Sequence, residues 1–147
     1  MVLVGTVLEL SAFLFEIPTG VVADVYSRKL SIVIGYITVG LGYMLLGFFP
    51  VFEIILLSNF IWGFGSTFLS GATQAWITDE VGETKANASF IVASQFGKIG
   101  GLLGIPICIA LAVIDLKYPI ILGSAGLVVL GILNWVLMTE KPFKAAS

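Results

Sequence analysis

The stretch GVVADVYSRK, residues Gly20–Lys29, is a short charged segment between two long apolar runs. The run before it, Val2–Ala23, contains only two charged residues, Glu9 and Glu16. The run after it, Leu30–Phe49, contains none. Each run is close to the roughly 20 residues that an α-helix needs to cross a bilayer. The stretch is therefore predicted to be a turn at a membrane surface that joins two transmembrane helices.

The composition of the 147 residues points to a membrane protein. Hydrophobic residues make up 59% of the chain, charged residues only 11%, and the mean hydropathy is +1.11, whereas soluble domains carry about 25% charged residues. The net charge of −2 gives no basic surface for a nucleic-acid partner. One cysteine, Cys108, excludes an internal disulfide. Because histidine is absent, we expect no metal site, and we expect no cofactor.

Five apolar segments are predicted to span the membrane as helices. The connectors between them are too short to form another domain, and an open sheet is excluded because lipid cannot satisfy its unpaired backbone groups. No secretory signal is visible at the N-terminus. We therefore predict one all-α transmembrane domain over residues 1–147, with spans at Val2–Ala23, Leu30–Phe49, Phe52–Ile77, Ala88–Ile114 and Pro119–Met138.

The distribution of basic residues predicts the orientation of the chain. Alternate connectors lie on alternate sides of the membrane, and the side with more lysine and arginine is usually cytoplasmic. The side that holds Gly20–Lys29 also holds most of the basic residues, so the N-terminus is predicted outside and the C-terminus inside. The residues on that side are Arg28, Lys29, Lys85, Lys141 and Lys144, whereas only Lys117 lies on the other side and Lys98 falls within a span.

The pattern Gly20-x-x-x-Asp24-x-x-x-Arg28-Lys29 between two membrane helices resembles the signature loop of the major facilitator superfamily (MFS). In that family the loop lies between the second and third helices on the cytoplasmic side. The preceding Phe15–Gly20 is similar to a bacterial, exporter-like branch. Val25 and Ser27 depart from the family pattern, which has a basic residue and a glycine there.

The resemblance covers nearly the whole chain and implies helices two to six of a twelve-helix transporter, part of its N-terminal half. It further implies that Asp79, at the end of the third span, pairs with Arg28. In the family the first and fourth helices of each half line the central path, and this chain supplies only the fourth. We therefore expect no transport by the chain alone; its partners would be the lipid bilayer, a small solute, and a missing C-terminal half or another copy.

Charged residues within two spans are candidates for a solute or coupling site. Glu9, Ala12, Glu16 and Gly20 recur at helical spacing on the first span, and carboxyl groups inside a bilayer normally face a bundle interior or a wet cavity. For Glu16 a transport role and a structural contact are equally good interpretations, whereas for Glu9 the structural contact is favoured, and hydration near the outer surface is a further option. Lys98 lies at a depth similar to that of Glu16, so a direct pair and a shared cavity both remain open.

Polar side chains also follow one side of the third span. Small and hydroxylated residues promote helix packing, but a stripe of this length is also able to line a solute cavity. On the fourth span, Gln95 lies near the face of Lys98, and two GxxxG patterns permit close helix approach. The polar candidates are Asn59, Ser66, Ser70, Gln74, Gln95 and Lys98.

No nucleophile–base pair, phosphate loop or metal cluster is recognisable, so the chain is predicted not to be an enzyme. The favoured interpretation is a partial transporter of a small solute or drug in the bacterial cytoplasmic membrane. The alternatives are a non-transporting scaffold or partner subunit and a small oligomeric channel.

Overall fold

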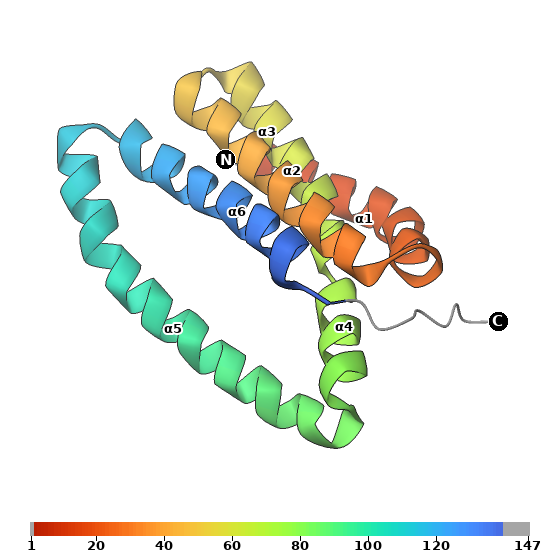
Figure 1. Ribbon diagram of the computed structural model, residues 1–147. Helices are drawn as coiled ribbons and strands as arrows, with labels where there is room; N and C mark the ends of the chain where they lie inside the picture. The colour runs from red at the N-terminus through yellow and green to blue at the C-terminus, as the bar shows by residue number, and fades with distance from the viewer. Residues whose placement is uncertain (1, 140–147) are drawn as a thin grey trace.

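The computed structural model describes residues 2–139, apart from the side chain of Asp24. The described residues form helices and no strand, and five segments are long and apolar enough to cross a membrane. Both the predicted all-α class and the five spans are thereby confirmed. The helices are α1 (Val2–Val25), α2 (Arg28–Phe48), α3 (Phe52–Leu69), α4 (Ala72–Val81), α5 (Glu83–Ile114) and α6 (Lys117–Leu137) (Figure 1).

Helix α2 packs between α3 and α6, and glycines make both contacts close. A Cβ atom at Gly35 would lie 2.6 Å from Leu69 Cγ of α3, and one at Gly40 would lie 2.7 Å from Val128 Cγ2 of α6. Gly42 and Gly47 repeat the two contacts seven residues further along, against α3 and α6 respectively. Because residues seven apart share a face of a helix, each pair of glycines forms a seam for one neighbour.

Helix α1 packs on the other side of α3. A Cβ atom at Gly63 would lie 1.8 Å from Ser11 Oγ and 2.6 Å from the carbonyl oxygen of Leu8, so the two backbones approach closely here. The Phe15 ring adds an edge-on contact with Phe64, with ring centroids 4.8 Å apart. Helices α1, α2, α3 and α6 thus form one packed unit.

The third span is not the continuous helix that was predicted over Phe52–Ile77. Helix α3 ends at Leu69, Ser70 takes an extended ψ of 139°, and Gly71 takes a φ of +69° before α4 begins. A positive φ is accessible to glycine at little cost and interrupts the helical hydrogen bonds. The Thr73 hydroxyl donates to the Leu69 carbonyl across the break, with an O–O distance of 3.0 Å, and so satisfies one group that the break leaves free.

The predicted connector Thr78–Asn87 is also largely helical, and Gly82, at a φ of +82°, divides α4 from α5 within it. Helix α5 begins at Glu83, five residues before the predicted Ala88. Alanine, lysine and glutamate are good helix formers, and Glu83 in the first turn suits the positive end of the helix dipole. Helix α4 ends at Val81, four residues after the predicted Ile77, and the ends of α1, α2 and α6 differ from the predicted bounds by at most two residues.

Helix α5 stands apart from the packed unit. Among the described residues it contacts only α4 and α6, its neighbours in the chain, and Figure 1 shows it diverging from the other helices along most of its length. The four glycines of its GxxxG patterns meet no neighbouring atom within 4 Å. The close approach that these patterns permit is therefore not used in the described part of the chain.

Candidate functional site

The end of the bundle where α1 meets α2 holds a charged cluster built around Arg28. Ser27 caps α2 by accepting a hydrogen bond from Leu30 N at 2.9 Å, and this fixes Arg28 as the first helical residue. The Arg28 guanidinium pairs with the Asp79 carboxylate of α4 and donates through Nη1 to the Ala75 carbonyl at 3.1 Å. The predicted pairing of Arg28 with Asp79 is present, and Arg28, Ala75 and Asp79 are called the Arg28 cluster below.

Two further contacts, which sequence reasoning missed, join α4 and α2 to the end of α6. The Trp76 indole N–H donates to the carbonyl of Thr139 at 3.3 Å, and the Lys29 ammonium lies 5.4 Å from the centroid of the Trp135 ring. Beside them, Ala72 and Met138 are buried in one small hydrophobic cluster. Aromatic and basic residues at span ends on one predicted side were the only sequence signal for these contacts.

Gly20, another residue of the predicted loop, is not part of this cluster. Gly20 is half-buried, and a Cβ atom there would meet nothing within 4 Å. The side chain of Asp24 lies outside the described residues, as do Lys141 and Lys144. The exposed fraction of the side chain is 22% for Arg28 and 59% for Asp79, so solvent or headgroups reach the carboxylate more easily than the guanidinium.

The structure does not bring Glu16 and Lys98 together. Both side chains are exposed, and α1 and α5 make no contact in the described chain. Glu9 on α1 and Gln95 on α5 are exposed as well. Similar depth in the membrane therefore did not place Glu16 and Lys98 side by side.

The polar stripe of the third span divides at the break after Leu69. Before the break, Asn59 Nδ2 donates to the Ile55 carbonyl at 2.8 Å, and the Ser66 hydroxyl donates to the Gly63 carbonyl at 2.8 Å. Both donors are therefore satisfied within α3. Ser70 at the break and Gln74 after it are exposed. Hydrogen bonds within α3 account for the polar groups before the break, and a solute role for the exposed residues after it stays a prediction.

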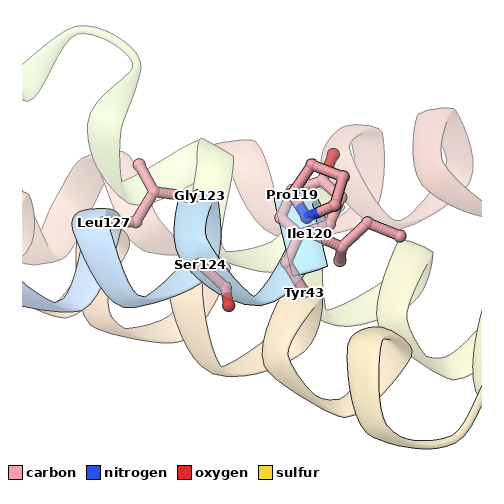
Figure 2. Close-up of a pocket in the computed structure, with 6 residues that line it drawn as sticks. All are labelled: Tyr43, Pro119, Ile120, Gly123, Ser124 and Leu127. Carbon is pink, nitrogen blue, oxygen red and sulfur yellow. The ribbon is translucent and has the colours of Figure 1, made fainter. Parts of the chain in front are cut away.

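The opposite end of the bundle holds an apolar groove of about 340 Å³ between α2 and α6. Figure 2 shows Pro119 and Ile120 beside Tyr43 at one end of the groove and Leu127 at the other, with Gly123 between them. Ser124 completes the lining, and its hydroxyl donates to the Ile121 carbonyl at 2.8 Å.

The described residues contain no group of three His, Cys, Asp or Glu side chains that could hold a metal ion.

Five membrane-length helices, a charged cluster at one end and polar residues at a helix break define a multi-pass α-helical membrane protein. The family model of the Major Facilitator Superfamily matches residues 2–147, and the chain belongs to this family of transporters.

A curated relative from Bacillus subtilis (strain 168), described as the uncharacterized MFS-type transporter YxaM, is 30% identical over 93 residues. The matched region covers 63% of this chain and 23% of the relative's own length. No solved structure matches the chain significantly.

Proposed function

We propose that this chain forms part of a secondary transporter that moves a small solute or drug out across the bacterial cytoplasmic membrane, and that it is not an enzyme. The observation that carries the proposal is the Arg28 cluster, which joins α2 to α4 at one membrane end in a chain of this superfamily. An ion pair between two helices at a membrane surface is able to hold a pathway closed and to release it when the pair separates.

Helix α4 is suited to be the moving part of this gate. It is a helix of 10 residues bounded by Gly71 and Gly82, both at positive φ, so its direction can change at either end without melting a helical turn. The Arg28 guanidinium fixes its position through the side chain of Asp79 and the backbone of Ala75. In this proposal the gate residues are Gly20, Asp24, Arg28, Lys29 and Asp79.

The polar residues within the spans are proposed to face the solute path or the coupling ion. Exposed carboxylate and ammonium groups are costly in hydrocarbon, and Glu16 and Lys98 are both exposed. Helices from the other half of a transporter, or from another copy, would cover these groups, and we therefore propose that the chain alone does not transport. The residues concerned are Glu9, Glu16, Asn59, Ser66, Ser70, Gln74, Gln95 and Lys98.

A non-transporting partner subunit or a small oligomeric channel is the second candidate. The exposure of α5 favours it, since an uncovered helix with small residues is able to receive another protein.

Transport assays distinguish these functions. Ethidium is supplied to inside-out vesicles that contain the chain alone or the chain with the remaining helices of the B. subtilis relative. We expect saturable, gradient-dependent uptake only with the added helices, and its loss in the Arg28→Ala variant. Uptake by the chain alone would contradict the need for further helices, whereas flux that neither saturates nor follows the gradient would favour the channel.

The proposed orientation, with the N-terminus outside and the C-terminus inside, has its own test. Cys108 is replaced by Ser, and single cysteines are placed at Ser27, Asn87 and Lys117. An impermeant thiol reagent applied to intact cells should label only the cysteine at position 117, because the more basic side is expected in the cytoplasm. Labelling at position 27 would reverse the orientation; permeabilised cells, in which all three should react, are the control.

A further inference from the structure

The groove between α2 and α6 lies far from the Arg28 cluster. Tyr43 follows Arg28 by 15 residues in α2, which corresponds to about 22 Å along a helix axis. The other lining residues, Pro119–Leu127, belong to the first turns of α6. The groove is therefore at the opposite membrane end and takes no part in the proposed gate.

The groove is built to receive hydrocarbon. Its volume of about 340 Å³ falls in the range of small-molecule pockets, roughly 300–1,000 Å³. The hydroxyl of Ser124 is satisfied within α6, and a Cβ atom at Gly123 would meet nothing within 4 Å. Because Gly123 lacks a side chain, the middle of the groove stays open to the bilayer, whose acyl chains are the apolar molecules at this depth.

Two oppositely charged residues, Asp115 and Lys117, shortly precede the first groove residue of α6, Pro119, in the sequence. Lys117 Nζ lies 3.1 Å from Asp115 Oδ2, and the side chains are 49% and 42% exposed. The pKa of Asp115 lies below its usual range because the Lys117 backbone N–H and side chain donate to the carboxylate, so Asp115 is ionised at neutral pH. A headgroup that carries both a phosphate and a primary ammonium complements this pair, since each charge meets its opposite.

Besides the Ser124 hydroxyl, which is bonded within α6, the groove lining carries the hydroxyl of Tyr43. The Tyr43 hydroxyl makes no hydrogen bond to the part of the chain that the structure describes, while the Tyr43 ring packs on Trp62 with centroids 5.3 Å apart. Tyrosines near the ends of membrane helices commonly place the ring in apolar surroundings and the hydroxyl at the interface. A lipid ester carbonyl is an acceptor found at that depth.

We propose that this groove binds one phospholipid of the phosphatidylethanolamine type. Its acyl chain lies along Gly123 between Tyr43 and Leu127, its phosphate meets Lys117, and its ammonium meets Asp115. The site is independent of solute transport.

Photolabelling tests the site on the full chain. The protein is placed in phosphatidylcholine vesicles with a trace of phosphatidylethanolamine that carries a diazirine in one acyl chain, and the labelled peptides are quantified. Labelling of residues 119–127 is measured relative to residues 99–113 of α5, most of which are exposed in the described chain, and which report that the chain is inserted. We expect preferential labelling of residues 119–127, displaced by unlabelled phosphatidylethanolamine at lower concentration than by phosphatidylglycerol with the same acyl chains.

Matched variants locate the site. Gly123→Leu should lower the labelling ratio about tenfold, the effect of excluding roughly two methylene groups from an apolar site. Gly126→Leu is the control, because Gly126 is equally free of neighbours within 4 Å but does not line the groove. Asp115→Asn should abolish the preference for phosphatidylethanolamine over phosphatidylglycerol, because only phosphatidylethanolamine carries the ammonium group that meets Asp115. The proposal is overturned by equal labelling of both segments, by equal competition from the two lipids, or by equal ratios in the two leucine variants.

Discussion

Helices α2 and α5 each contain four glycines but use them in opposite ways. At every glycine of α2 an added Cβ atom would come within 3.0 Å of another helix, whereas at the glycines of α5 it would meet nothing within 4 Å. In the 18-residue apolar stretch of α2, 44% of the residues are buried, against none in that of α5. Small residues therefore give a helix the capacity for close packing, and a partner at the right place decides whether it is used.

Hydropathy does not account for the difference between the two helices. The 18-residue apolar stretch has a mean hydropathy of 2.1 in α5 and 1.8 in α2, so the helix with the more apolar stretch is the less buried one. In a bilayer this is no contradiction, since lipid tails solvate apolar side chains as well as another helix does. Burial within a membrane is set by shape and polar contacts, and α5 offers these through its glycines and its polar residues, among them Gln95 and Lys98.

The largest effect that sharpens this comparison is expected from glycine replacements. Gly40→Leu should lower the free energy of unfolding by about 3 kcal/mol or prevent folding, because the new side chain would collide with Val128 and with the Ser124 carbonyl, 3.0 Å from the added Cβ. Gly101→Leu in α5 is the matched control and should change it by less than about 0.5 kcal/mol. Denaturant titration in mixed micelles measures both, and equal losses would mean that α5 is packed as tightly as α2.

A smaller effect is expected where α2 holds α4. Arg28→Ala and Asp79→Ala should each destabilise the chain, and the double variant should lose less than the sum, with a coupling of about 0.5–1 kcal/mol. The estimate is low because Asp79 is 59% exposed. The control is a second double-mutant cycle, in which Arg28→Ala is combined with Glu83→Ala. Strict additivity for Arg28 and Asp79 would show that their pair contributes nothing.

Features that depend on a single helix or on one strong motif could be predicted from the sequence. The number of spans followed from apolar length, and the Arg28–Asp79 pair from the family pattern. The break at Ser70–Gly71 was not predicted, because no proline marks it. Whether a glycine inside a span takes a positive φ depends on its tertiary neighbours.

The sequence also could not show which helices lie next to each other in the bundle. Position along a span gives depth, and on that basis Glu16 and Lys98 were expected to share a pair or a cavity. Depth says nothing of which helices are adjacent, and α5 diverges from α1 (Figure 1). The groove beside Gly123 was missed for the same reason, since it is formed by residues of α2 and α6 that are far apart in the chain.

The most direct test of the contrast between α2 and α5 needs no substitution. One chain per lipid nanodisc is footprinted with a small lipid-soluble diazirine, and labelling is read residue by residue over residues 39–48 of α2 and 95–104 of α5. We predict that labelling of α2 is concentrated at its exposed positions, Leu41, Leu45 and Phe48, and that labelling of α5 extends all round the helix. A single labelled stripe on α5, with the rest protected as in α2, would contradict the account.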